Sequence, residues 1–96
     1  MTPLPNRRPT QLSLGPLEAE IVDILHTLGS ATVKEIHACI VSNPTRELAI
    51  ASVTTILNRL AKKGWVAFSK DGRAFVWQPL ISREEAQILK AHDRLQ

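Results

Sequence analysis

The chain has 96 residues, of which 44% are hydrophobic and 22% are charged, and its formal net charge is +3. This length allows one domain with one modest core, and this composition excludes a disordered or fibrous chain. No apolar run is long enough for a membrane span or a secretory signal, and the single cysteine, Cys39, excludes an internal disulfide, so we expect a cytoplasmic protein without membrane contact.

Residues 1–13 hold three prolines and no hydrophobic periodicity, which predicts a flexible N-terminal arm. A first helix is predicted to begin at Gly15-Pro16, because proline is tolerated at the first helical position, and to end at Gly29. Apolar residues recur between these ends at helical spacing, so one face of this helix is expected to pack on a core.

The next segment, residues 30–32, is short and could form a fragment of strand. Thr32 and Glu35 match a capping box, in which each side chain accepts a hydrogen bond from the other residue's backbone N–H. This pair predicts a second helix from Val33, which Asn43-Pro44 would end because proline restricts the residue before it.

A third helix is predicted from about Ile50 to Lys63, with Gly64 as its C-cap, because its apolar residues fall in one stripe. Residues 65–79 read as a β-hairpin of two aromatic and β-branched runs around Asp71-Gly72, which predicts a tight type I′ turn.

The last predicted helix begins at Ser82, which has Glu85 three residues later as a second capping box. The element order is therefore helix, short strand, helix, helix, hairpin, helix. This order predicts a winged helix-turn-helix, mainly α with a small antiparallel β-hairpin, in which residues 14–80 bind DNA and residues 81–96 contribute to a dimer.

The charge is unevenly distributed along the chain. Residues 16–50 hold five acidic and two basic residues, a net charge of −3, whereas residues 51–73 hold five basic and one acidic, a net charge of +4. Basic charge gathered in one short segment is typical of a surface that binds a polyanion, although a solvated patch gives the same count.

The third helix carries no acidic residue, and its non-apolar positions begin with hydroxyl and amide side chains and end with basic ones. In a helix-turn-helix such short polar groups meet base edges in the major groove, and the basic groups meet phosphates. The alternative is a solvated helix whose terminal lysines complement its macrodipole. The candidate DNA contacts are Ser52, Thr54, Thr55, Asn58, Arg59, Lys62 and Lys63.

Two further basic pairs join these candidates. Lys70 and Arg73 bracket the predicted hairpin turn, where the wing of a winged helix reaches the DNA backbone beside the third helix. Arg7 and Arg8 in the arm could enter a minor groove, although such arms are more often solubilising tails.

Three segments, LGPLEAEIVDILHTLGSATVKEIH, ASVTTILNRLAKKGWV and GRAFVWQPLISREEA, resemble the penicillinase-repressor (BlaI/MecI/CopY) family of winged-helix regulators over residues 14 to about 86. The resemblance implies a bacterial dimeric repressor of a dyad operator. It places DNA-facing hydroxyls at Ser52 and Thr55, and the basic contacts at the three positions already named near the end of the helix. The family often has threonine where this chain has Ala51, so the operator sequence is expected to differ.

Family members usually continue through further helices that form most of the dimer interface, and carry there either a protease-cut bond or paired Cys-x-Cys ligands. This chain ends at Gln96 after one helix, so either it is a fragment or dimerisation and induction work differently. We expect residues Ser82–Gln96 to contribute to a homodimer; a sensor or protease partner is not identified.

A metal site is not expected. His37 and Cys39 would point about 200° apart on a helix, so they cannot share an ion, and adding His26 has no support in the spacing. Cys39 is interpreted as a small, partly buried hydrophobe. No cofactor is expected, and no nucleophile elbow, phosphate loop or paired-carboxylate pattern indicates an enzyme.

The hairpin aromatics could stack on single-stranded bases, but packing on the helices is the preferred interpretation. They are Trp65, Phe68, Phe75 and Trp77. Two rival functions remain open. A protein-interaction module would show an exposed apolar patch in place of a basic face, and a MarR-like or ArsR-like regulator would need an effector pocket.

Overall fold

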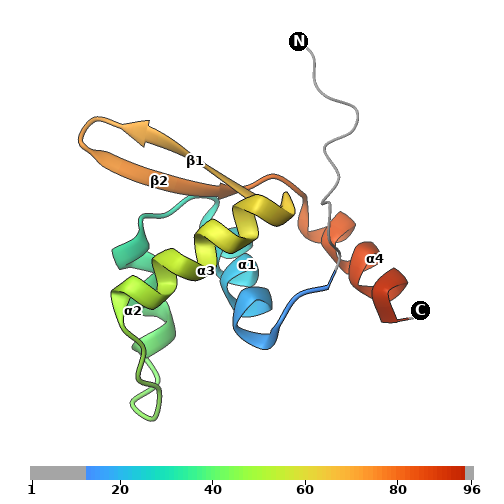
Figure 1. Cartoon of the computed structure of the whole chain (residues 1–96), viewed down its shortest axis with the longest axis horizontal. Helices are drawn as coiled ribbons and strands as arrows, with labels where there is room; N and C mark the ends of the chain where they lie inside the picture. The colour runs from blue at the N-terminus through green and yellow to red at the C-terminus, as the bar shows by residue number, and fades with distance from the viewer. Residues whose placement is uncertain (1–12, 95–96) are drawn as a thin grey trace.

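The computed structural model describes residues 13–94, and describes side chains as far as Leu89. Its elements are α1 (Pro16–Leu28), α2 (Val33–Val41), α3 (Ile50–Lys63), β1 (Val66–Asp71), β2 (Ala74–Pro79) and α4 (Arg83–Arg94). Helices α1, α2 and α3 form the body, the hairpin extends from it alongside α3, and α4 follows at the other end (Figure 1). This arrangement confirms the predicted winged helix-turn-helix; of the predicted arm, only Ser13 lies within the described residues.

The helix ends follow local capping chemistry. At α2 the capping box is complete: Thr32 N–H donates to Glu35 Oε1 at 2.8 Å, and Glu35 N–H donates to Thr32 Oγ1 at 3.2 Å. At α3 the C-cap Gly64 takes the left-handed conformation, with φ of 89°. Before α4, Glu85 N–H donates to Ser82 Oγ at 3.0 Å, one of the two bonds expected there.

The predicted strand fragment at residues 30–32 is a single β-bridge. Ala31 and Trp77 exchange two backbone hydrogen bonds, of 2.9 and 2.8 Å, so the bridge ties the start of the helix-turn-helix to the base of the hairpin. The core lies between the three body helices and that base. Its fully buried side chains are Ile21, Val22, Leu25, Ile36, Ile40, Val53, Leu57, Leu60, Trp65 and Val66.

The hairpin turn differs from the prediction. Asp71 pairs with Ala74, so the two loop residues are Gly72 and Arg73 and the turn is one residue later than expected. Gly72 has φ of 65°, whereas none of the described non-glycine residues has a positive φ. Type I′ requires positive φ at both loop residues, and type II′ requires it only at the first. The type I′ prediction is therefore wrong: the φ signs are those of type II′, which leaves Arg73 in an ordinary conformation.

The prediction that all four hairpin aromatics pack on the helices is half correct. Trp65 and Trp77 are buried at the base of the hairpin. Phe68 and Phe75 are each 54% exposed, because the outer half of the hairpin diverges from α3 and leaves a hollow between the two (Figure 1). These two side chains are large exposed hydrophobic groups on the wing.

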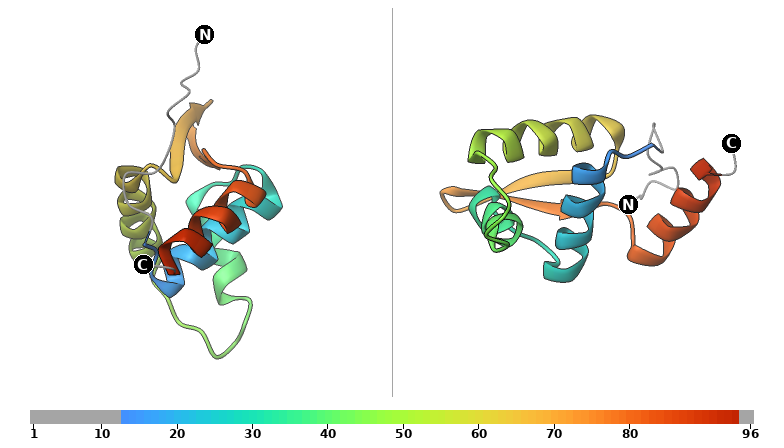
Figure 2. Two further views of the ribbon diagram at one scale, coloured as in Figure 1. Left: turned by 90° about the vertical axis from the view of Figure 1, so that its right-hand side faces the viewer. Right: turned by 90° about the horizontal axis from the view of Figure 1, so that it is seen from below.

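Helix α4 packs on the body through its first half, as far as Leu89, and then leaves it (Figure 2). The ring Nε2–H of His26 donates to Ile81 O at 2.8 Å, and Arg83 Nη2 donates to Thr27 Oγ1 at 3.1 Å, so both bonds join the start of α4 to the end of α1. Ala86 is buried, but Ile88 is 60% exposed. Over residues 13–94, none of the helices combines the length and the apolar character that crossing a bilayer demands.

Candidate nucleic-acid interface

The outward face of α3 carries four of the predicted contacts side by side. Thr55, Asn58, Arg59 and Lys62 line one shallow depression of about 250 Å³. Asn58 and Arg59 lie three and four residues after Thr55, Lys62 lies four and three residues after them, and all four are exposed. No acidic residue lines this depression. The structure thus brings together one hydroxyl, one amide and two cations on a surface open to solvent.

The threonine hydroxyls of α3 are turned back onto the helix. Thr55 Oγ1 donates to Ala51 O at 3.0 Å, and Thr54 Oγ1 donates to Ile50 O at 3.4 Å. Because each hydroxyl hydrogen is used within the helix, what Thr55 offers outward is an acceptor oxygen and a methyl group. Such a side chain suits an amino group or a thymine methyl at a base edge.

Lys63 does not share this face. Its Nζ donates to Glu18 Oε1 at 2.8 Å and to Ser13 O at 3.0 Å, so the side chain turns toward the start of α1 and is only 16% exposed. At 100° per residue, Lys63 lies about 80° from the buried Val53 direction, whereas Lys62 lies about 180° from it. Helical spacing alone therefore points Lys63 away from the direction of Lys62.

Glu18 is the partner that the sequence analysis missed. Its carboxylate is 9% exposed, and Oε1 also accepts the backbone N–H of Gly15 at 2.8 Å, while Oε2 is buried without a hydrogen-bond partner. Burial raises the pKa of Glu18, but the hydrogen bonds from Lys63 and Gly15 and the charges of Lys63 and Arg59 outweigh it, so the pKa is lowered overall. The charged carboxylate therefore clamps the end of α3 to the start of α1.

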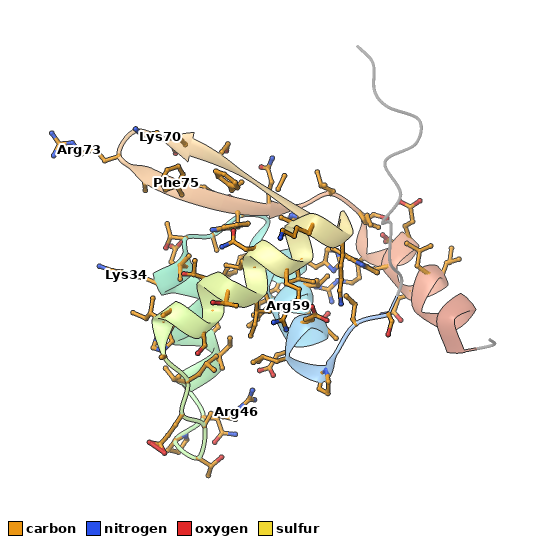
Figure 3. The ribbon with its side chains drawn as sticks, in the orientation of Figure 1. Lys34, Arg46, Arg59, Lys70, Arg73 and Phe75 are labelled. Atoms are coloured by element: carbon orange, nitrogen blue, oxygen red, sulfur yellow. The ribbon has the colours of Figure 1, made fainter. Side chains whose placement is uncertain are left out.

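The wing adds two further cations beside α3. Lys70 and Arg73 are exposed at the hairpin tip, as predicted from their positions around the turn (Figure 3). Lys34, in the first turn of α2, is exposed below the wing and was not predicted. The sequence could have indicated Lys34 as a candidate phosphate contact, because the first helix of a helix-turn-helix crosses the DNA backbone. Arg46, in contrast, forms a bidentate ion pair with Glu20, with bonds of 3.2 and 2.9 Å.

The remaining sequence candidates are placed as follows. Ser52 is half-buried on the side of α3 toward Lys63, and Thr54 is half-buried on the side toward the wing. Arg7 and Arg8 lie outside the described residues. The chain leaves the arm at Ser13, whose carbonyl is held by Lys63 at the C-terminal end of α3.

His37 and His26 each donate a hydrogen bond to a backbone carbonyl of another segment. His37 Nε2–H donates to Leu48 O at 2.6 Å and so holds the loop before α3, as His26 holds the start of α4. Among residues 13–94, no group of three His, Cys, Asp or Glu side chains is placed to hold a metal ion. Cys39 is exposed, so its interpretation as a partly buried residue is wrong. It faces outward from α2, at a shallow pocket shared with α1.

A second hollow lies between α3 and the wing. Its volume is about 340 Å³, and its lining combines aromatic and aliphatic side chains with two polar residues of α3. The lining residues are Val33, Thr54, Asn58, Phe68, Phe75 and Trp77. Asn58 lines both hollows, so they are neighbouring parts of one surface.

Known proteins are similar to this chain over most of its length. A family model described as Penicillinase repressor matches residues 14–96. The transcriptional regulator BlaI of Mycobacterium tuberculosis, in strains CDC 1551 / Oshkosh and ATCC 25618 / H37Rv, is 37% identical over 73 residues, which are 75% of this chain and 51% of that protein. The chain therefore spans about half the length of the curated relatives it matches.

Two solved structures share the architecture. The solution structure of the DNA-binding domain of the repressor BlaI superposes with a TM-score of 0.65 and 26% identity, and the match covers 81% of this chain and 90% of that one. The oxidized form of MarR from E. coli has a TM-score of 0.62 and 19% identity, over 88% of this chain and 61% of that one. The second likeness concerns the fold alone.

Proposed function

The chain belongs to the penicillinase repressor family, and from that premise we propose that it is a bacterial transcriptional regulator that binds double-stranded DNA and represses its target. Helix α3 lies in the major groove, and the wing tip at Lys70 and Arg73 contacts the backbone. The proposed activity is binding, not catalysis, and its place is the cytoplasm, where an operator is found.

One observation carries this proposal: the depression on α3 is exposed, is lined by two polar and two basic residues, and is free of acidic side chains. Thr55 and Asn58 are short enough to let the helix backbone approach base edges, and Arg59 and Lys62 extend to phosphates on either side. An acid here would repel the DNA, and its absence has no corresponding reason in a merely solvated helix. Lys63 is left out of the proposed contact set, because its ammonium is held by Glu18 and Ser13.

Adjacent lysines give a matched test. Each phosphate contact contributes roughly one unit to the slope of log K against log salt concentration. Lys62→Met should weaken binding to all duplexes and reduce that slope by about one, whereas Lys63→Met should leave the slope unchanged. The measurement is a salt titration of binding to the chain's own upstream region and to a mixed-sequence duplex. Equal slopes for the native chain and Lys62→Met would show that α3 is wrongly oriented.

We also propose that the protein acts as a homodimer through residues 82–96. Support comes from α4, which leaves the body with Ile88 60% exposed, and from Leu28, which is 45% exposed at the end of α1. A two-fold dimer would read two half-sites about one helical turn apart. Sedimentation of the chain with and without DNA measures the stoichiometry.

The rival function, a protein-interaction module without DNA binding, finds support in the exposed Phe68 and Phe75. Those side chains, however, lie beside the basic face and do not replace it. Absence of any duplex shift at low salt would favour the rival.

A further inference from the structure

The core does not explain the two exposed phenylalanines of the wing. In the hairpin register Phe68 lies opposite Trp77, and Lys70 lies opposite Phe75, so all four side chains share the inner face of the hairpin. The Phe68 and Phe75 rings meet edge to face with centroids 5.6 Å apart, and the Phe68 and Trp77 centroids are 5.0 Å apart. We call Phe68, Phe75 and Trp77 the aromatic ladder.

The aromatic ladder forms one wall of the groove between the wing and α3, whose volume is about 340 Å³. Thr54 and Asn58 of α3 form the opposite wall, and Val33 contributes from the first turn of α2. Because Asn58 also lines the depression proposed to meet bases, a duplex seated on α3 would cover this groove as well. The groove is thus continuous with the proposed DNA surface.

Charge around the groove favours a polyanion. Lys34 lies on one side of it, and Lys70 and Arg73 lie at the wing tip on the other (Figure 3). No acidic side chain lines the groove. Asp71, the acid at the tip, is paired with Ala74 and belongs to the opposite face of the hairpin from Phe68 and Phe75.

A DNA strand matches this combination of groups, because its phosphates alternate with deoxyribose rings that present C–H faces. We propose that the groove receives one sugar–phosphate strand of duplex DNA, with deoxyribose packed on Phe68 and Phe75 and the flanking phosphates near Lys34 and Lys70. This proposal rests on the proposed function and adds to it an apolar contact. Such a contact strengthens binding to every sequence alike and releases no counterions.

The test uses the whole 96-residue chain and a mixed-sequence duplex of about 30 base pairs, long enough to cover more than one bound site. Phe75→Ala and Phe68→Ala should each weaken binding roughly three- to thirtyfold, as expected from losing burial of a half-exposed ring. The slope of log K against log salt should stay at its native value. Lys70→Ala is the electrostatic control and should reduce the slope by about one. Phe75→Leu, which keeps an apolar side chain, should fall between Phe75→Ala and the native chain.

Hydroxyl-radical footprinting supplies a direct readout, because the radical attacks accessible deoxyribose. The native chain should protect sugars beside the wing, and Phe75→Ala should expose those sugars while protection beside α3 remains. Each variant is first checked for a native unfolding transition; these side chains are half exposed, so folding is expected to survive.

Unchanged affinity in both alanine variants would overturn the proposal and leave the aromatic ladder to a protein partner or a small aromatic ligand. A loss of affinity accompanied by a smaller salt slope would also overturn it, because the substitution would then have removed a phosphate contact and not an apolar one. If the native chain shifts no duplex at low salt, the proposed function fails as well, and that result is distinct from either of the others.

Discussion

The clamp between α3 and α1 leads to a prediction about stability. Lys63→Met keeps most of the apolar stem and removes the ammonium that pairs with Glu18 at 2.8 Å. The two side chains are 16% and 9% exposed, so the pair is closer to a buried pair than to a surface pair. Removing one partner of a buried pair costs about 3–5 kcal/mol, and a surface pair contributes about 0–1 kcal/mol. We expect Lys63→Met to lower the free energy of unfolding by about 2–3 kcal/mol, less than for a fully buried pair, because solvent still reaches the lysine.

The expected loss is large for a small domain. At about 0.05–0.15 kcal/mol per residue, a chain of this length has a free energy of unfolding of roughly 5–14 kcal/mol. Each kcal/mol lowers Tm by about 4–8 °C at this size, so Lys63→Met should lower Tm by roughly 8–24 °C. Urea unfolding at pH 7, followed by circular dichroism, measures the free energy directly. Lys62→Met changes an exposed neighbour, so it should lower the free energy of unfolding by less than Lys63→Met does.

A second substitution tests the cause. Glu18→Gln keeps an acceptor for the Gly15 N–H and removes the charge. The double variant with Glu18→Gln and Lys63→Met should therefore be more stable than Lys63→Met alone, because in Lys63→Met a buried carboxylate has lost its cation. Because the pKa of Glu18 is lowered in the folded chain, its contribution is present above the ordinary value of 4.5 and is lost as pH falls through the folded pKa. The difference between the native chain and Glu18→Gln should therefore shrink in acid. A Lys63→Met chain as stable as the native one would refute this reasoning.

Substitutions at three other positions test separate parts of the molecule. Gly72→Ala and Gly72→Asn should each lower the free energy of unfolding by about 1 kcal/mol in urea unfolding, because the first loop residue of a type II′ turn has a backbone conformation that favours glycine; a Gly72→Asn chain as stable as the native one would refute that reason. Thr55→Val removes the acceptor oxygen and keeps a methyl, so it should change the ranking of operator variants in a binding series by about 1–3 kcal/mol without altering the salt slope; an unchanged ranking would remove Thr55 from base contact. Ile88→Gln should shift the sedimenting species toward the monomer with an unchanged circular dichroism spectrum, and an unchanged mass would place the dimer contact elsewhere.

The sequence by itself determined the start of α2 and the end of α3, because the causes of those two boundaries are local. The Thr32–Glu35 capping box and the glycine after α3 each act within one helical turn, and the predicted helix limits at both sites agree with the structure. The acid-free face of α3 was also readable, since a helix places residues three and four apart on the same side. These features needed no knowledge of what packs against them.

Only the tertiary structure decided which of these residues are available to a ligand. Helical spacing alone turns Lys63 away from the direction of Lys62, but it does not show that Glu18, 45 positions earlier than Lys63, lies there to hold its ammonium. Trp77 and Phe75 lie on the same strand face, and they differ because the hairpin diverges from α3 beyond Trp77 and leaves Phe75 facing a hollow. Burial and ion pairing depend on the distance between segments remote in sequence, and a local pattern contains no information about that distance.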